Sequence, residues 1–280
     1  MFSKVSSSHV ASLAVGATLA LGAFAALPSA HAGVIVSDTF GSGTYMNGRT
    51  PNTTDVPGTT WAANGSSNNG PSTGTWENNI VSGSARLGAD VGDGISLTGG
   101  IATVYNISDS FVVNSENTGL GATRGDALGF FSSVSQVRTS TTLHGYDAFT
   151  GLVVNNNGTV TLLSSSSSGS YTSLASTTVS EFTAAISHTL SYSVNTSTGT
   201  ISNILLDGSS VALPTPSSNP FTVAATAYAG IFSSSNIGSG YGTFQNFVVS
   251  TPTAVPEPAS LGLLAVGGLG LLLVGKRRHA

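Results

Sequence analysis

Residues 188–206 read HTLSYSVNTSTGTISNILL, and this stretch predicts the kind of fold. Apolar and polar residues alternate in its first part, which sends Leu190, Tyr192 and Val194 to one face of an extended strand. The polar segment 195–199, which ends in glycine, separates this run from a second apolar run, 201–206. Two such runs joined by a short polar turn indicate a β-hairpin, and therefore an antiparallel sheet.

The same pattern recurs on both sides of this hairpin. Short runs rich in β-branched and aromatic residues alternate with clusters of Gly, Asn and Ser. They predict strands at 34–40, 80–87, 100–107, 110–113, 127–134, 149–154, 159–163, 171–179, 188–194, 201–206, 210–213, 224–232 and 243–249. Asn157-Gly158 and Asp207-Gly208 are turn signals, because these residues accept positive φ. Residues 164–170 and 214–219 read as loops.

No helical periodicity accompanies these strands. About a dozen short strands with turns between them favour one all-β domain, an antiparallel sandwich or barrel. A repeat of fixed period is not evident, so a propeller or β-helix is less favoured.

The C-terminal 26 residues have a different organisation. They begin with a proline-flanked acidic motif, formed by Val255, Pro256, Glu257, Pro258, Ala259 and Ser260. An uncharged apolar run follows, residues 261–275, which as a helix would extend roughly 22 Å against a hydrocarbon core of ~30 Å. The basic residues Lys276, Arg277 and Arg278 could close that gap by snorkelling and should stay cytoplasmic. We predict a membrane-spanning helix at about 261–275, with a basic tail at 276–280.

These three parts in this order resemble the PEP-CTERM sorting signal of Gram-negative bacteria. The resemblance implies recognition by an exosortase, a membrane-embedded enzyme, with cleavage near the motif at residues 255–260. It also implies an association with bacteria that form exopolysaccharide and biofilm. The hydrophobic tail would then hold the precursor in the membrane for processing and would be removed from the mature protein, as in a GPI signal.

The N-terminus reads as a secretory signal peptide. Lys4 supplies a weak positive region, residues 10–27 are apolar, and Ala30-His31-Ala32 fits the small-x-small cleavage rule before Gly33. We therefore expect a signal peptide at 1–32, a passenger domain at 33–254 and a sorting segment at 255–280. Signal peptidase and the general secretion machinery would carry the chain across the inner membrane. It would then be membrane-anchored transiently, before it reaches the cell surface or extracellular matrix.

The composition of the passenger excludes several classes of function. Only 7% of the chain is charged, and the passenger has four arginines against eleven acids, so it offers no basic face for nucleic acid. Cysteine is absent, which removes thiol catalysis, disulfides and cysteine-based metal sites. Such a surface, solvated by hydroxyls and amides, suits an extracellular protein among polysaccharides.

A second resemblance covers most of the passenger. Its pieces are Asp38-Thr39-Phe40, residues 46–51, Trp61, Gly145-Tyr146, residues 151–158, residues 188–208, residues 228–231 and residues 244–247. Together they look like a concanavalin A-like (LamG-type) domain. This family implies a curved two-sheet jelly roll whose concave face often binds sugars, although many members have no known ligand.

No catalytic residues are predicted. Hydrolases of this fold carry a Glu-x-Asp-x-x-Glu pattern, and none of Glu77, Glu116 and Glu181 has an Asp two residues on. No Gly-x-Ser-x-Gly elbow stands between a strand and a helix. We expect His144 to be an exposed loop residue and His188 to be hydrogen-bonded or on the surface.

Candidate binding residues are few, and each has a structural alternative. Asp90 and Asp93 could offer oxygen ligands to Ca²⁺ from a turn, but Asx-turns at a strand boundary explain the same residues more simply. Arg49, at the end of a turn, could pair with an acid. Four aromatic residues could contact a glycan or pack in the core: Trp61, Trp76, Tyr146 and Tyr241. The sequence assigns no cofactor, leaves Ca²⁺ open, and does not identify carbohydrate-binding residues.

Two functional readings follow from these observations. The first is a non-enzymatic surface or matrix protein that associates with extracellular polysaccharide. The second is a lectin-like module with a defined carbohydrate site, which could depend on Ca²⁺. A glycan-active enzyme is a distant third.

Overall fold

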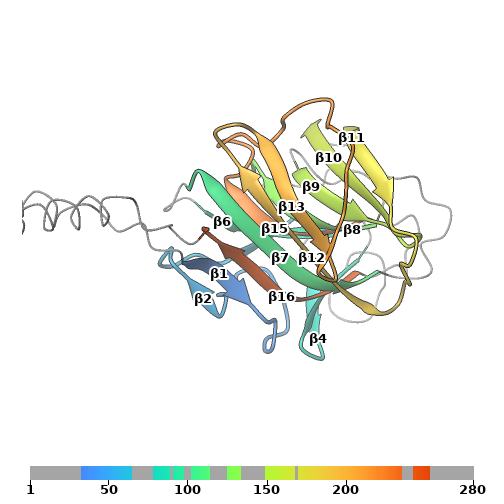
Figure 1. Ribbon diagram of the computed structural model, residues 1–280. Coiled ribbons are helices and arrows are strands. Elements are labelled where there is room, and N and C mark those ends of the chain that lie inside the picture. The colour runs from blue at the N-terminus through green and yellow to red at the C-terminus, as the bar shows by residue number, and fades with distance from the viewer. Residues whose placement is uncertain are drawn as a thin grey trace, which may run out of the picture. The chain divides into compact units, whose positions relative to one another are not determined.

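Two antiparallel β-sheets make up the ordered part of this protein. The computed structural model describes residues 33–64, 78–88, 91–97, 102–113, 125–133, 149–167, 170–234 and 242–252. These residues form sixteen strands and no α-helix, and Gly33–Pro252 is one compact unit. Figure 1 shows the strands in two layers. The predicted all-β, two-sheet antiparallel sandwich is confirmed.

The first layer, sheet A, contains nine strands. Seven follow one another across the sheet: β14 (Ser209–Ser210), β13 (Thr200–Leu206), β12 (Ser187–Asn195), β7 (Val104–Val112), β16 (Gly242–Ser250), β1 (Val34–Asp38) and β2 (Thr53–Thr54). Beside them, β5 (Ser84–Leu87) pairs with β16, and β4 (Asn78–Val81) pairs with β5.

The second layer, sheet B, contains seven strands. Their order is β11 (Ser170–Thr178), β10 (Thr159–Ser167), β9 (Phe149–Val154), β8 (Gly125–Phe131), β15 (Tyr228–Ser234), β6 (Val91–Ser96) and β3 (Trp61–Asn64). The chain changes layer on both sides of β3, of β6 and of β15, between β7 and β8, and between β11 and β12. Non-consecutive strands therefore lie side by side, as in a jelly roll.

The main core lies between the two sheets. In β7 buried and half-buried residues alternate, so that Ile107 and Phe111 face inward from sheet A. Leu128 and Phe130 face them from sheet B, and the Tyr105 and Phe130 rings meet at 5.9 Å. Tyr192 in β12 donates a hydrogen bond to the Leu128 carbonyl oxygen at 2.7 Å, which joins the layers directly.

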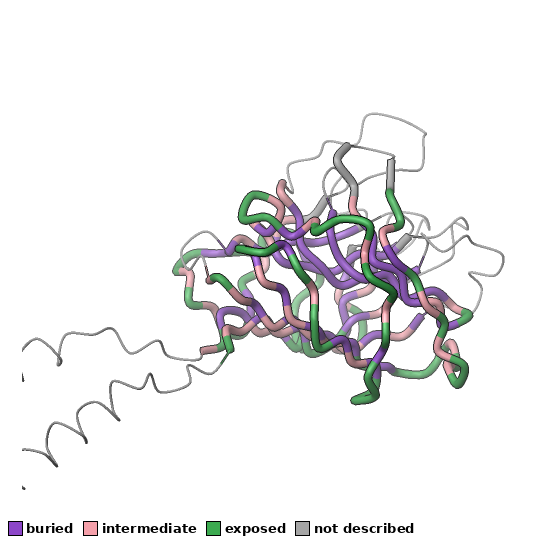
Figure 2. Tube along the Cα trace, turned by 45° about the horizontal axis from the view of Figure 1, so that its top comes forward, coloured by how far each residue is buried: buried purple, intermediate pink, exposed green. Residues whose placement is uncertain are grey.

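The central strands β8 and β9 of sheet B are buried on both faces. Every residue of β8 and β9 is buried, and a second apolar cluster forms on the outer face of this sheet. Phe131, Phe149 and Phe232 are its aromatic members, with ring centroids 5.2 Å and 5.6 Å from Phe149. Figure 2 shows long buried stretches in the interior of the sandwich.

Several predicted strand boundaries are wrong. The predicted strand 80–87 is two strands, because Ser82 and Gly83 both have positive φ and form a tight turn. The predicted strands 100–107 and 110–113 form one continuous strand, β7. The serine-rich segment 164–167, expected as a loop, extends β10 through pairing with β11. The short strands β2, β3 and β6 have no counterpart in the prediction.

The N-terminal and C-terminal residues of the sandwich are hydrogen-bonded to each other. The Gly33 amide donates to Thr251 Oγ1 at 3.2 Å, and the Thr251 amide donates to the Gly33 carbonyl at 3.0 Å. β1 and β16 are paired throughout β1, from Val34 with Ser250 to Asp38 with Phe247. The first and last residues of the sandwich therefore lie side by side, at the same end of the paired strands β1 and β16.

Candidate functional site

Most of the predicted sorting residues lie outside the described part of the chain. This applies to the motif at 255–260, the basic residues Lys276, Arg277 and Arg278, and the predicted signal residues Ala30 and Ala32. The candidates Asp90, Trp76, Tyr146, Tyr241 and His144 also lie outside it. Within the described residues, no helix has the length and apolarity to cross a membrane. The predicted spanning segment, 261–275, is not among these residues.

Trp61 is a core residue rather than a sugar platform. It is fully buried between the Phe40 and Phe247 rings, at centroid distances of 5.6 and 5.1 Å. Its Nε1 donates to Asp38 Oδ2 at 2.8 Å. Arg49 Nη2 contacts Asp38 Oδ1 at 2.9 Å, which is the acid pairing expected for Arg49. This buried network connects β1 in sheet A with β3 in sheet B.

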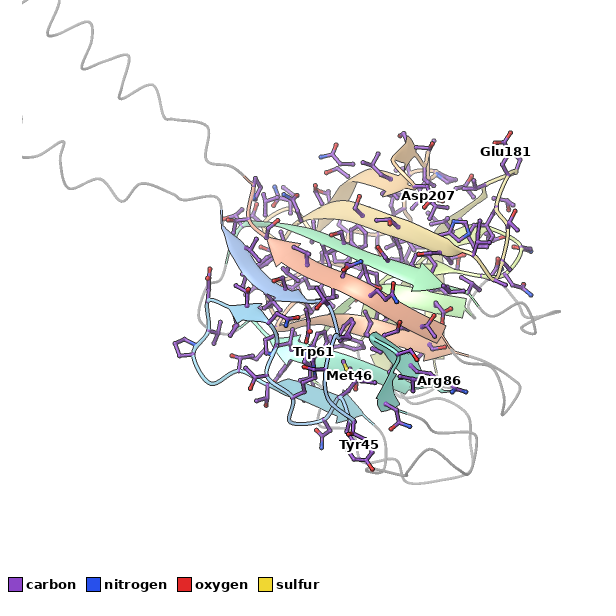
Figure 3. The ribbon with its side chains drawn as sticks, turned by 90° about the horizontal axis from the view of Figure 1, so that it is seen from below. Tyr45, Met46, Trp61, Arg86, Glu181 and Asp207 are labelled. Atoms are coloured by element: carbon purple, nitrogen blue, oxygen red, sulfur yellow. The ribbon has the colours of Figure 1, made fainter. Side chains whose placement is uncertain are left out.

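His188 also has a structural role. Its Nε2 donates to the Thr183 carbonyl at 2.8 Å, while its Nδ1 lies 2.6 Å from Asp207 Oδ2. The Phe182 ring stacks on the imidazole at a centroid distance of 4.2 Å. With both nitrogens engaged and 4% of the residue exposed, His188 has no free nitrogen to act as a catalytic base. Figure 3 shows Asp207 and Glu181 at the opposite end of the sandwich from Trp61.

Three carboxyl groups lie inside the sandwich. Asp109 (β7), Asp126 (β8) and Asp93 (β6) are at most 1% exposed. Burial raises the pKa of Asp126 to about 7, although the Ser233 hydroxyl beside it lowers the pKa slightly. Burial also raises the pKa of Asp109 well above its ordinary value, and the nearby Asp126 carboxyl adds to this effect.

The three buried carboxyl groups do not form a catalytic site that a substrate could reach. Asp93 lies within a buried strand rather than in the turn expected for a Ca²⁺ ligand, which corrects that expectation. Among the described residues, no cluster of three or more His, Asp or Glu side chains could hold a metal. The sequence gives little sign that Asp109 is buried. Its place in the alternation of strand β7 points inward, but an acidic residue is normally expected to be exposed.

A groove lies on the outer face of sheet A, across β7, β12, β13 and β16. Its volume is about 220 Å³. Uncharged side chains line it: Asn106, Ser108, Ser191, Ser193, Asn203 and Ser250. They form two rows, because Ser250 and Ser193 both pair with Asn106, while Ser191 pairs with Ser108 and Leu205. Leu205 adds an apolar patch at one side.

A β-bulge shapes this groove. The register between β12 and β13 shifts between Ser191 and Ser193, where β13 contains one extra residue. Asn203 lies in this bulge with a φ of 52°, in the left-handed region that asparagine tolerates better than most residues. Its Nδ2 donates to Ser193 Oγ at 3.3 Å, and Ser193 Oγ donates to Asn106 Oδ1 at 2.7 Å. Bulges commonly redirect a side chain in this way.

The groove retains unused hydrogen-bonding groups. Within the described part of the chain, no hydrogen bond engages the hydroxyls of Ser108, Ser191 and Ser250. Asn106 Nδ2 and Asn203 Oδ1 are likewise without a described partner. The arrangement therefore presents donors and acceptors to solvent without any formal charge. Sequence reasoning missed it, because its residues come from four separate strands.

Comparisons with known proteins identify the tail. Residues 254–278 match the PEP-CTERM protein-sorting motif. The C-terminal segment is a PEP-CTERM sorting signal. Such a motif implies a secreted protein that is anchored transiently, processed by an exosortase and sorted to the cell surface. The match covers the tail alone, and no curated protein matches the chain.

Solved structures similar to the chain are distant. The carbohydrate recognition domain of Emp46p in its metal-free form is 13% identical with a TM-score of 0.45, covering 68% of this chain and 87% of that domain. Peanut lectin is 12% identical with a TM-score of 0.41, covering 69% and 97%. A carbohydrate esterase from a Shiga toxin-encoding bacteriophage is 13% identical with a TM-score of 0.41, covering 79% and 99%. No ligand or activity of this chain follows from them.

Proposed function

We propose that this chain is exported across the inner membrane of a Gram-negative bacterium and released to the cell surface or extracellular matrix. Signal peptidase would remove residues 1–32, residues 261–275 would anchor the chain, and an exosortase would cleave near the motif at 255–260. The PEP-CTERM match at residues 254–278 is the observation that carries this proposal.

The boundaries of the sandwich support this processing scheme. β1 begins at Val34, one residue after the predicted cleavage site, and β16 ends at Ser250, before the motif. Cleavage at both predicted places would leave every described strand intact. The processed domain would keep the Gly33–Thr251 hydrogen bonds that close its edge.

The proposed role at the surface is non-enzymatic association with extracellular polysaccharide, as in a biofilm matrix. Hydrolysis of a glycan needs two carboxyls that flank a bound substrate. The described carboxyl pair that interacts, Asp109 and Asp126, is enclosed between the sheets, while Glu181 is exposed. These positions favour binding over catalysis.

Mass spectrometry of the mature protein from its native cells tests the processing. We expect an N-terminus at Gly33 or a neighbouring residue, and loss of the segment after Ser260. A surface protein that still ends in Arg278-His279-Ala280 would contradict cleavage, although it would be compatible with anchoring.

A lectin-like module is the second candidate function, and the uncharged groove on sheet A favours it. A glycan array separates a defined sugar specificity from weak general association with polysaccharide. Adding EDTA in parallel tests whether any such binding depends on Ca²⁺. Specific binding that EDTA abolishes would support a Ca²⁺-dependent lectin, whereas absence of any specific sugar would remove this candidate.

A further inference from the structure

The outer faces of the two sheets are not equally available to a ligand. On sheet B this face carries Phe131, Phe149 and Phe232, which are 0–1% exposed. On sheet A the corresponding face carries half-exposed or exposed serine and asparagine side chains. Among the central strands of the two sheets, an exposed polar surface is therefore found on sheet A.

The charge of that face restricts the ligand. The ionisable residues of β7, β12, β13 and β16 are Tyr105, Asp109, His188 and Tyr192, and all four are buried. The outer face of these strands therefore presents no charge. Recognition of an anionic polymer would need cations to pair with its carboxylates or phosphates. A neutral molecule rich in hydroxyls satisfies serine and asparagine groups without leaving a charge unpaired.

The shape of the groove is compatible with a chain-like ligand. The two cross-strand rows run from Ser250 in β16 to Asn203 and Leu205 in β13. Leu205 can contact the C–H surface of a sugar ring, while the free groups of Asn106 and Asn203 can bond its hydroxyls. The left-handed bulge holds Asn203 beside Ser193 before any ligand arrives, which reduces the entropy lost on binding.

We infer that this groove on sheet A is the binding site for a neutral polysaccharide, with Asn203 and Asn106 as its principal hydrogen-bonding residues. The inference rests on the proposed association with extracellular polysaccharide and adds the site and the ligand charge. It places the site on the polar sheet A rather than on sheet B.

The test measures binding of the full-length chain in detergent to immobilised laminarin and dextran, with alginate as the anionic counterpart. The variant Asn203→Gly removes the amide and suits the left-handed backbone of this residue. Asn246→Gly is the matched control, because Asn246 is also an exposed residue in a bulge of sheet A with positive φ, at 58°, but does not line the groove.

We expect binding to at least one neutral glucan, and no binding to alginate. Asn203→Gly should weaken the binding about tenfold, the loss of one or two hydrogen bonds, and Asn246→Gly should leave it unchanged. A second groove variant, Asn106→Ala, should weaken binding similarly if it retains the wild-type melting temperature.

The outcomes separate the inference from the function on which it rests. Wild-type binding that neither groove variant weakens overturns the groove and leaves the polysaccharide association standing. No binding of the wild-type chain to either glucan overturns both. Preferential binding to alginate overturns the neutral-ligand assignment. Concentration-dependent dimerisation that Asn203→Gly abolishes would assign the face to a second copy of the chain instead.

Discussion

The outer faces of sheets A and B differ in polarity although the same antiparallel pairing builds both. In β12 the sequence alternates, so Leu190, Tyr192 and Val194 face the core and the serines between them face outward. In β8 and β9 every residue is buried, and apolar side chains lie on both faces beside the buried polar residues Asp126 and Thr150. A sheet buried on both faces needs such continuous apolar strands. The comparison indicates that sheet B is structural on both faces, whereas sheet A has one face free.

Glycine makes the outer face of sheet B possible. Gly129 and Gly151 are cross-strand partners in β8 and β9. A Cβ atom at either position would lie 2.6–2.8 Å from the ring of Phe149. The missing side chains therefore allow the Phe149 ring to lie directly over the backbone, between Phe131 and Phe232.

The largest expected difference between the faces is in stability. Phe149→Ala should lower the free energy of unfolding by about 3–5 kcal/mol, because it removes a fully buried ring and leaves a cavity. Ser191→Ala on sheet A should change it by less than about 0.5 kcal/mol. Urea denaturation measures both values. A Phe149→Ala loss as small as that of Ser191→Ala would mean that the outer face of sheet B is not structural.

The carboxyl groups buried between the sheets should make the free energy of unfolding depend on pH. Since the pKa of Asp126 is raised to about 7 in the folded state, the folded protein binds more protons than the unfolded chain above the ordinary pKa. Stability should therefore be highest in acid and fall by about 3 kcal/mol between about pH 4 and pH 7, at roughly 1.4 kcal/mol per unit of pKa difference.

Asp126→Asn tests this assignment. The variant should remove the part of the decline that comes from Asp126 and leave the part that comes from Asp109, as measured by urea denaturation at several pH values, while Asp55→Asn, at an exposed carboxyl, should retain the whole decline. A wild-type stability that rises from pH 4 to pH 7 would contradict the raised pKa values of Asp109 and Asp126.

Because the Phe149 ring lies close to Gly151, a substitution at Gly151 should also lower stability, but by less than Phe149→Ala. Gly151→Ala should destabilise the protein by about 1–3 kcal/mol, because the added methyl group meets the Leu128 carbonyl oxygen and the Phe149 ring. Gly41→Ala is the control, since a Cβ there meets only Thr39 Oγ1 at 3.4 Å. Thermal unfolding of the pair compares them, and equal melting temperatures would show that sheet B tolerates a side chain at this position.

A smaller loss of stability is predicted at Asp207, in the turn after β13 of sheet A. Asp207→Gly keeps the left-handed turn but removes the acceptor of the Thr189 amide and the partner of His188. We expect a loss of about 1–2 kcal/mol in urea denaturation, because a buried nitrogen of His188 is left unpaired. Asn203→Gly, the same kind of change at another left-handed residue of sheet A, should cost less. An equal loss would mean that the groove is as structural as the edge.

Much of the architecture could be predicted from local pattern. The alternation in residues 188–194 predicts a strand with one buried face, and β12 has it. Asp207-Gly208 predicts a tight turn, and both residues have positive φ. The serine-rich end of β10 could not be predicted, because serine has no strand preference and these residues pair only because β11 lies beside them.

The candidate site was less predictable than the fold. Asp93 reads as a turn residue from its glycine neighbours, yet it is a fully buried residue of strand β6. Trp61 reads equally as a sugar platform or a core residue, and the Asp38 carboxyl that holds its indole comes from another sheet. The groove depends on a register shift between β12 and β13, which no pattern within one strand reveals.

By itself the sequence determined the sorting address of this protein, its many short strand-forming runs and its low content of charged residues, because each can be read from the residues alone. The PEP-CTERM match at residues 254–278 needs no folded context. Only the tertiary structure decided which sheet keeps a free face, which carboxyls are buried and which serines and asparagines meet in a groove. These depend on cross-strand register and on layer packing, which bring residues together from strands far apart in the chain.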